Sequence, residues 1–465
     1  MPQNPFTPLP GRSSMSRRLF LTTTGALSLG AALTACGGDS GGGSSASAEP
    51  VSRADIDKAM KTPTELTFWT WVPNIGKEVA LFEKRYPAIK VKVVNAGQGT
   101  PQYTKLRTAL KAGSGAPDLV QIEYQAIPTF TITNSLLDLR PYGASALRST
   151  FVDWTWGQVS GSDGEVWAIP QDTGPMGMLY RQDIFDEHGI DVPRTWDEFA
   201  AAARRLHRAD PDVYLTNLAA NQVAAWHGLL WQAGAKPYAS SSRSDIDISV
   251  DDAVSQKLGA YWGGLAKEGV IGVEPDFTDS WYAALDKGRY ATWITAAWGP
   301  VFLSGSAKTT AGKWRAAPLP QWDAAKPRSG NWGGSTTAVL RGTENPVAAA
   351  LFAQFLNSDP ASARMFATEQ FFFPATKALL TDAAFVSDAP SFYGGQKVNQ
   401  VFADISSTVN SSFQWPPFLD QAATDWTETV GKSLADKGDT VTALGAWQSR
   451  LTAYAKGQGF TVKGS

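Results

Sequence analysis

Along the first part of the chain, segments with the apolar pattern of a strand alternate with segments that have the pattern of a helix. Residues 66–71 (LTFWTW) predict a buried strand, and residues 89–94 (IKVKVV) alternate apolar and polar as a second strand does. Between them, residues 77–85 predict a helix, and another helix begins at Thr100 with proline in its first turn. Residues 117–122 predict a third strand. This strand–helix order is typical of a parallel sheet covered by helices.

A second set of strands and helices follows. Residues 164–170 (GEVWAIP) and 177–180 (GMLY) predict strands, and so do residues 289–295 (RYATWIT). Thr195 begins a capping box that starts a helix, and residues 249–267 predict another amphipathic helix. Because sheet-and-helix units occur twice along the chain, we expect an α/β protein with two lobes.

Composition narrows the function. The chain has 465 residues, 43% hydrophobic and 18% charged, which is the profile of a globular protein with two or three domains. Its net charge of −2 argues against a nucleic-acid partner, which would need a basic surface. Tryptophan is abundant, at 18 residues, and this favours ligand binding by aromatic stacking. We expect no metal ion and no cofactor, because His188, His207 and His227 lack the spacing of metal ligands.

Residues 1–35 have the features of an export signal. Arg17 and Arg18 precede a weakly apolar run that is too short and too rich in small residues to be a permanent membrane span. The paired arginines resemble a twin-arginine signal, and an ordinary secretion signal is the alternative.

The tetrapeptide LTAC, which ends at Cys36, resembles a bacterial lipobox. In such signals the chain is cut before the cysteine, whose sulfur receives a diacylglycerol that holds the protein on a membrane. Residues 36–63 then predict a flexible tether rich in Gly and Ser. The run GDSGG around Ser40 also fits a nucleophile elbow, but it lacks the flanking strand and helix, so we expect no catalytic serine there.

The order of several segments is more specific than any one of them. LTFWTW is followed by FEKRYPAIKVKV, GSGAPDLVQIE and SLLDL, then by GEVWAIPQDTGPMGMLYRQDIFDEHGI, VPRTWDEFAAAARRL and GGSTTAVLRGTENPVAAALFAQFL. Together they resemble the extracellular solute-binding proteins of ABC importers, in particular the sugar-binding group that includes maltodextrin-binding protein. The resemblance covers residues 64–460.

This resemblance implies a two-lobe clamshell of the periplasmic-binding-protein type (a Venus flytrap), with a mixed sheet flanked by helices in each lobe. The chain would cross between lobes near Pro170, Pro318 and Gln370. The implied units are residues 64–169 plus 318–368 for one lobe and residues 170–317 plus 369–465 for the other.

The resemblance also implies a function. A receptor of this kind captures a mono- or oligosaccharide without catalysis and delivers it to membrane permease subunits that are driven by a cytoplasmic ATPase. It would be a monomer, lipid-anchored on the outer face of the cytoplasmic membrane. One alternative is a polyamine, iron complex or peptide bound in the same fold. Another is a secreted glycoside hydrolase with Glu123 and Asp172 as its carboxylate pair.

Candidate ligand-binding residues follow the predicted strands, because ligands of open α/β sheets bind beyond the carboxyl ends of strands. An indole face stacks on the C–H face of a sugar, and a carboxylate accepts hydrogen bonds from two hydroxyls. The alternatives are core packing for a tryptophan and a solvated loop for a carboxylate. The first two candidates share one face of the first predicted strand. The candidates are Trp69, Trp71, Glu123, Tyr124, Asp172, Trp298, Trp332 and Trp415.

Overall fold

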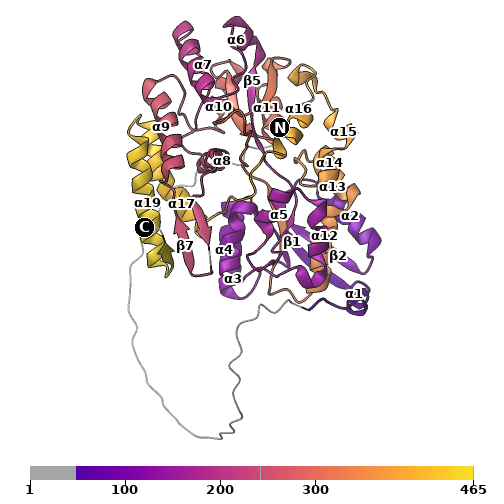
Figure 1. Ribbon diagram of the computed structural model, residues 1–465. Helices are drawn as coiled ribbons and strands as arrows, with labels where there is room; N and C mark the ends of the chain where they lie inside the picture. The colour runs from indigo at the N-terminus through magenta and orange to yellow at the C-terminus, as the bar shows by residue number, and fades with distance from the viewer. Residues whose placement is uncertain (1–48, 241, 464–465) are drawn as a thin grey trace, which may run out of the picture. The chain divides into compact units, whose positions relative to one another are not determined.

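The structure, a computed structural model, describes residues 49–240 and 242–463 (Figure 1). The predicted signal peptide, the lipidation site Cys36 and the tether up to residue 48 lie outside these residues. Within the described part of the chain, no helix combines the length and the apolarity that crossing a bilayer requires.

Part of the segment expected to be a flexible tether, residues 36–63, is helical, because Arg53–Ala59 form helix α1. Ser52 caps this helix by accepting a hydrogen bond from the backbone N–H of Asp55 at 3.1 Å. Met60, which follows the helix, is buried against the first core. The Gly/Ser composition of the preceding residues gave no signal for this short capped helix.

A five-stranded mixed sheet, in the order β2-β1-β3-β10-β4, forms the centre of the first lobe. β1 pairs in parallel with β2 and β3, which confirms the predicted parallel unit, and β10 runs antiparallel to β3 and β4. The strands are β1 (Thr64–Trp69), β2 (Ile89–Val94), β3 (Leu119–Glu123), β4 (Ile169–Pro170) and β10 (Ser335–Val339).

Two of the strand predictions are corrected in this lobe. Of residues 164–170, only Ile169 and Pro170 pair in the sheet, and Val166 makes an isolated bridge to Ser160. β1 begins at Thr64 and ends at Trp69, so Trp71 lies beyond the strand.

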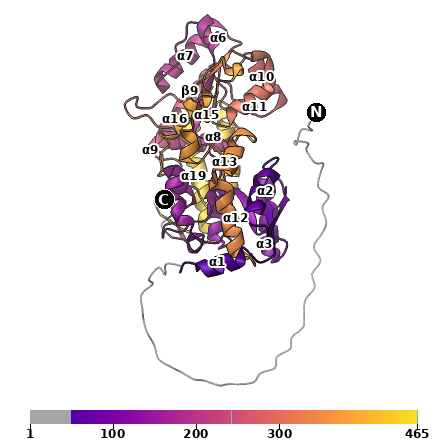
Figure 2. The ribbon, with the colours of Figure 1, turned by 90° about the vertical axis from the view of Figure 1, so that its right-hand side faces the viewer.

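Helices cover this first sheet, and α12 lies beside α2 in both views (Figures 1 and 2). The Phe352 ring of α12 lies 5.7 Å from the ring of Phe68 in β1 and 5.0 Å from that of Phe82 in α2, so this late helix completes the core of the early strands. The helices of this lobe are α2 (Gly76–Arg85), α3 (Thr100–Ala112), η1 (Tyr124–Ala126), α4 (Ile127–Ile132), η2 (Arg140–Tyr142), η3 (Ala144–Thr150), α5 (Asp153–Val159), α12 (Pro346–Ser358) and α13 (Pro360–Thr368).

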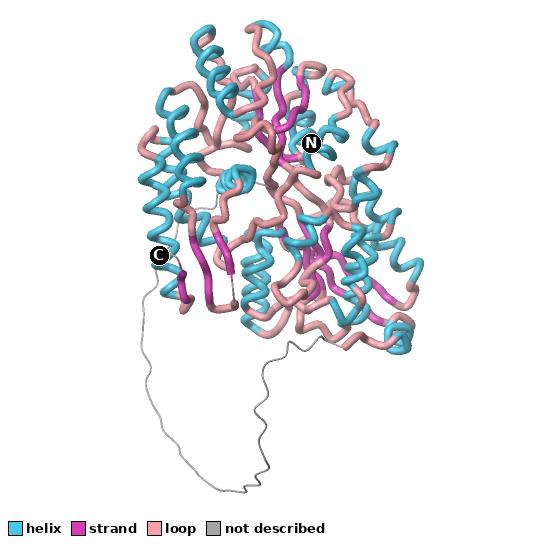
Figure 3. Tube along the Cα trace, in the orientation of Figure 1, coloured by secondary structure: helices cyan, strands magenta, loops and turns pink. Residues whose placement is uncertain are grey.

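Two smaller sheets, of three strands each, belong to the second lobe. Figure 3 shows the sheets apart from one another, with helices and loops between them. In one, β5 is antiparallel to β8 and β9, and residues 214–216 extend it in parallel, with the N–H of Thr292 donating to the carbonyl of Leu215 at 2.7 Å. The strands are β5 (Met176–Arg181), β8 (Thr292–Ala296) and β9 (Trp314–Pro318), and in the other sheet β6 (Tyr238–Ser240), β7 (Asp245–Ile248) and β11 (Thr461–Lys463).

The second lobe is mainly helical, as the sequence indicates for the C-terminal part. The capping box of α7 is confirmed, because Thr195 and Glu198 exchange side-chain and backbone hydrogen bonds. Its helices are α6 (Gln182–Glu187), α7 (Trp196–Ala209), α8 (Val223–Ala233), α9 (Ala253–Glu268), α10 (Asp279–Asp286), α11 (Gly299–Ser306), η4 (Lys308–Thr310), α14 (Lys377–Leu380), α15 (Ala383–Val386), η5 (Ser391–Tyr393), α16 (Val398–Ser406), α17 (Leu419–Trp426), the π-helix η6 (Thr427–Gly431), α18 (Lys432–Ala435) and α19 (Thr440–Gly457).

Three segments connect the two lobes and are hydrogen-bonded to one another. The first contains Thr173 and Gly174, the second residues 331–334, and the third Phe373. The backbone N–H of Gly174 donates to Asn331 Oδ1 at 2.8 Å, and the N–H of Thr173 donates to the carbonyl of Phe373 at 2.8 Å. Consecutive glycines, Gly333 and Gly334, have φ values of 81° and 90°, which allow the second segment to turn sharply back into β10. These segments hold the two lobes at a common junction.

Candidate functional site

A cavity of about 160 Å³ lies where side chains of the two lobes face each other. Helices α3 and α4 and the carboxyl end of β3 form one wall, while α8, α17 and Trp415 form the other. Gly333, from a connecting segment, completes the lining. The cavity therefore lies beyond the carboxyl end of a strand, where α/β proteins bind ligands.

Glu123 supplies an acceptor on the first wall. It is the last residue of β3, and the hydroxyl of Tyr103 in α3 donates to Glu123 Oε2 at 3.0 Å. In return, the backbone N–H of Glu123 donates to the Tyr103 oxygen at 3.0 Å. Burial raises the pKa of the Glu123 carboxyl above its ordinary value, although the Tyr103 hydrogen bond opposes this. Glu123 is half-buried, so its carboxylate can accept further hydrogen bonds from the cavity side.

His227 supplies an uncharged aromatic surface on the opposite wall. Its Nδ1 lies 2.9 Å from the carbonyl of Val223, which only accepts, so Nδ1 carries the proton. Nε2 is therefore the acceptor for the Tyr238 hydroxyl at 3.1 Å. Burial lowers the pKa of His227 to about 4, so the ring is neutral near pH 7.

Trp415 extends this aromatic wall. Its ring lies 5.2 Å from the ring of His227 and 5.0 Å from that of Phe413. Sequence reasoning considered His227 only as a metal ligand and missed it as part of the cavity. The hydrogen bond from His227 to Val223, four residues earlier on α8, is a local contact that the sequence can suggest. The sequence gave no signal that α8 faces α3 across a cavity.

An ion pair joins the two walls. Arg107 Nη2 of α3 lies 2.7 Å from Asp420 Oδ2 of α17, and both residues line the cavity. The two side chains are 38% and 50% exposed, so the pair is at the rim rather than deep inside. Sequence reasoning missed both residues, because they are 313 positions apart and each alone is typical of a solvated helix face.

Of the predicted ligand-binding residues, the structure places Glu123 and Trp415 in the wall of this cavity. Trp71 is next to it, with its ring 6.4 Å from that of Tyr103 and its backbone N–H bound to Gln121 Oε1. Trp69 is half-buried and packs against the first core. A direct ligand contact for Trp69 and Trp71 stays a prediction.

Tyr124 and Asp172 lie behind the cavity, at the junction of the lobes. Tyr124 is 1% exposed, and its hydroxyl donates to the carbonyl oxygen of Asp172 at 3.1 Å. Asp172 Oδ1 accepts hydrogen bonds from the N–H of Ser335 at 3.0 Å and from Gln171 Nε2 at 3.2 Å. Burial raises the pKa of Asp172 to about 7. These hydrogen bonds link Asp172 to Tyr124 and to the start of β10, and a ligand contact for Tyr124 and Asp172 stays a prediction.

Trp298 and Trp332 contact each other and are not among the residues that line this cavity. Their rings lie 4.8 Å apart in an edge-to-face arrangement, and Trp298 Nε1 donates to the carbonyl of Trp332 at 2.8 Å. Phe277 packs on both rings. Their role as stacking platforms stays a prediction.

Comparison with known proteins places this architecture in a family. A family model described as bacterial extracellular solute-binding protein matches residues 69–363. The arabinooligosaccharide-binding protein of Halalkalibacterium halodurans is 27% identical over 371 residues, which are 77% of this chain and 81% of that protein. The lactose-binding protein of Rhizobium radiobacter is 26% identical over 364 residues, 73% of this chain and 81% of that protein.

A solved structure agrees with these relatives. The ABC transporter associated binding protein from B. animalis subsp. lactis, in complex with β-1,6-galactobiose, matches with a TM-score of 0.74 and 32% identity, covering 86% of this chain and 99% of that one. The family model spans well over half of the sequence. The chain therefore belongs to the bacterial extracellular solute-binding protein family.

Proposed function

We propose that this protein is the solute-binding receptor of an ABC importer and that it captures a mono- or oligosaccharide between its two lobes. The observation that carries this proposal is the cavity between the lobes, with a half-buried carboxylate on one wall and neutral aromatic rings on the other. The names of the relatives support a sugar, since they bind arabinooligosaccharides, lactose and β-1,6-galactobiose.

In this proposal each wall has a distinct role. Glu123 accepts hydrogen bonds from sugar hydroxyls, and charged acceptors form the stronger bonds. Trp415, which is packed on the fully buried ring of His227, offers an apolar surface to the C–H groups of the sugar. A sugar that contacts both walls stabilises the closed arrangement more than the open one and so shifts the population toward it. The lobes would consist of residues 64–169 plus 318–368 and residues 170–317 plus 369–465.

The family acts outside the cytoplasm, and the finer location is part of the proposal. Diacylglycerol on Cys36 would anchor a monomer to the outer face of the cytoplasmic membrane. The loaded protein would dock on two permease subunits, which a cytoplasmic ATPase drives. It would release the sugar unchanged, without catalysis.

The other solute classes have less support. A polyamine site would need clustered carboxylates, and of the two acidic residues in the lining, Asp420 is paired with Arg107. A glycosidase would need both Glu123 and Asp172 at a substrate, whereas the Asp172 carboxylate accepts backbone and amide hydrogen bonds behind the cavity.

A binding screen tests the proposal. We expect galactobiose, lactose or an arabinooligosaccharide to raise the melting temperature of the purified protein by a few degrees at about 100 times its Kd. Spermidine, peptides, iron complexes and divalent metals should leave it unchanged. A rise with one of these compounds and with no sugar would overturn the sugar assignment, and release of monosaccharide from a bound oligosaccharide would favour a hydrolase.

Substitutions locate the binding. Glu123→Gln should weaken sugar binding about 10- to 100-fold in calorimetry, because a hydrogen bond to a charged group is worth roughly 1.5–3 kcal/mol. Glu65→Gln is the matched control, since Glu65 is exposed on the same sheet, and its variant should bind as the parent does. Equal affinity of the Glu123→Gln variant and the parent would exclude this cavity as the site.

A further inference from the structure

Apart from Arg107 and Asp420, the lining of the cavity holds one more charged residue, Glu123. Arg107 and Asp420 come from different lobes, and their closest charged atoms are 2.7 Å apart. This separation is far smaller than the thickness of a sugar ring. No ring can pass between the two side chains unless the lobes separate or the side chains rotate away.

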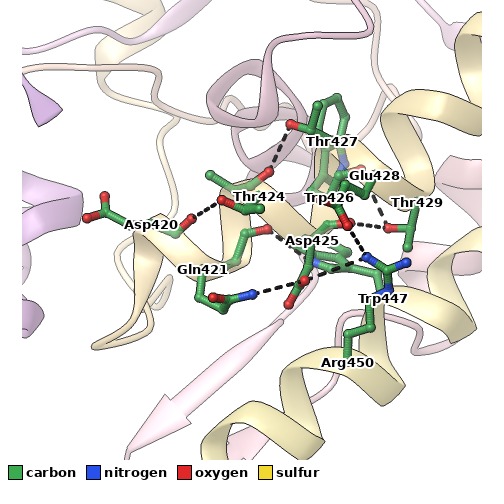
Figure 4. Close-up of polar contacts among 12 residues, drawn as sticks. Asp420, Gln421, Thr424, Asp425, Trp426, Thr427, Glu428, Thr429, Trp447 and Arg450 are labelled. Carbon is green, nitrogen blue, oxygen red and sulfur yellow. Dashed lines mark hydrogen bonds and ion pairs between the residues drawn. The ribbon is translucent and has the colours of Figure 1, made fainter. Parts of the chain in front are cut away.

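Asp420 is presented by a firmly held helix. Trp447 Nε1 of α19 donates to the carbonyl of Ala422 in α17 at 3.1 Å, and Arg450 of α19 pairs with Glu428 at 2.5 Å. Figure 4 shows these contacts on one side of α17, while the Asp420 carboxylate points away from them. The Asp420 carbonyl accepts the Thr424 hydroxyl at 3.0 Å, and the Asp420 carboxylate pairs with Arg107.

Arg107 is presented by an equally well held helix. Gln102 Nε2 donates to the carbonyl of Gln121 in β3 at 2.8 Å, and Lys105 Nζ donates to the carbonyl of Ala96 at 2.6 Å. Tyr103 binds Glu123, and Leu106 is fully buried. Both helices are therefore anchored to their own lobes, so separation of the lobes breaks the ion pair, as rotation of either half-exposed side chain also does.

We infer that Arg107 and Asp420 form a clasp across the rim of the cavity, which slows the release of a bound sugar and limits its length. The inference rests on the proposed function and extends it to specificity. The cavity behind the clasp, about 160 Å³, is smaller than the roughly 300–1,000 Å³ of common ligand pockets, and this favours a short sugar. A longer chain must open the clasp to leave through this rim.

The clasp is tested by neutralising or exchanging the charges of Arg107 and Asp420 and measuring how fast the sugar dissociates. With β-1,6-galactobiose as the first probe, Arg107→Gln and Asp420→Asn should each raise the dissociation rate about two- to fivefold, as the strength of a half-exposed ion pair dictates. The exchanged pair Arg107→Asp with Asp420→Arg should return the rate to within about twofold of the parent. Tryptophan fluorescence in a stopped-flow instrument measures these rates.

A matched control separates the clasp from surface charge in general. Arg204 and Glu268 form an ion pair of similar exposure, 46% and 42%, within the second lobe. Arg204→Gln should leave the dissociation rate unchanged. If the two single clasp variants release the sugar no faster than this control, or if the exchanged pair is as fast as either single variant, the inference is wrong.

Ligand length gives a second readout. The parent should bind a disaccharide more tightly than a tetrasaccharide of the same linkage. The double variant Arg107→Ser with Asp420→Ser should reduce that preference about fivefold or more, because the rim is then open. An unchanged preference would contradict the length limit.

A ligand-free measurement distinguishes failure of the clasp from failure of the proposed function. Small-angle X-ray scattering of the protein without sugar should give a larger radius of gyration for Arg107→Gln than for the parent, and the exchanged pair should restore the parent value. If no sugar binds, the proposed function fails while this measurement still decides the clasp. Identical radii in all three proteins would refute it.

Discussion

Asp172 shows how a single side chain can stabilise the junction between the lobes. The residue is 5% exposed, and its carboxylate accepts the backbone N–H of Ser335, the first residue of β10. Burial raises its pKa to about 7, against roughly 3.9 in an unfolded chain. Between these two values the folded protein binds a proton more tightly than the unfolded chain does. Stability therefore falls as the pH rises from about 4 to about 7.

The Asp172→Asn variant should lose this pH dependence. The asparagine oxygen still accepts the Ser335 N–H but does not ionise, so the parent should lose roughly 1–4 kcal/mol of unfolding free energy relative to the variant between pH 5 and pH 8. Urea unfolding at the two pH values measures the difference.

Asp388→Asn is the control for this prediction, because Asp388 is exposed. Its variant should follow the parent at both pH values. If Asp172→Asn also followed the parent, the carboxyl would titrate at its ordinary pKa and the junction would not depend on its protonation.

At the scale of elements, the π-helix η6 (Thr427–Gly431) interrupts the regular α-helical geometry between α17 and α18. It inserts an extra residue between α17 and α18, which rotates one helix relative to the other by about 100°. Gly431 ends it, and a Cβ there would lie 2.5 Å from the carbonyl oxygen of Ala220. The missing side chain lets the helix approach the backbone that precedes α8.

Gly431→Ala should lower the unfolding free energy by about 1–3 kcal/mol, because overpacking forces the backbone near Ala220 to move. Gly445→Ala in α19 is the matched control, since a Cβ there meets nothing within 4 Å. That change should raise stability by roughly 0.5–1 kcal/mol, because alanine favours the helix. Denaturant titration of the two variants checks both signs, and equal shifts would argue against the close contact.

Element prediction succeeded where the signal was local. The capping box at Thr195 and the alternation of residues 89–94 each specify their structure through neighbouring residues, and both are confirmed. The strand expected over residues 164–170 failed because its apolar residues pack in an irregular segment, where only the last two residues meet β10. Strand pairing depends on a partner that is distant in sequence.

At the scale of the whole molecule, each lobe combines stretches that are far apart in the chain. The first core takes residues from 60–169 and again from 338–375. The two cores of the second lobe take residues from 154–332 and 409–455, and from 179–316 and 363–405. β10, from the late stretch, separates β3 from β4 in the first sheet. Neither lobe can therefore fold from a single continuous piece.

A fragment of residues 49–320 should consequently fail to unfold cooperatively. It lacks β10 and α12, and with α12 the Phe352 ring that packs on Phe68 and Phe82. Near-ultraviolet circular dichroism and urea unfolding should show loss of fixed aromatic packing. Addition of residues 321–465 should restore part of the signal, and a native-like transition in the fragment alone would disprove the argument.

The sequence by itself determined the α/β class, the parallel unit at the start of the chain, the capped helices and the family, because each rests on local periodicity or on an ordered set of motifs. Two of its candidates, Glu123 and Trp415, line the cavity, and their contact with a ligand stays a prediction. Only the tertiary structure decided which tryptophans are buried in the core, as Trp196, Trp262 and Trp447 are, and which residues meet across the lobes. Burial and the pairing of Arg107 with Asp420 depend on how distant segments pack, and one strand or helix does not encode that alone.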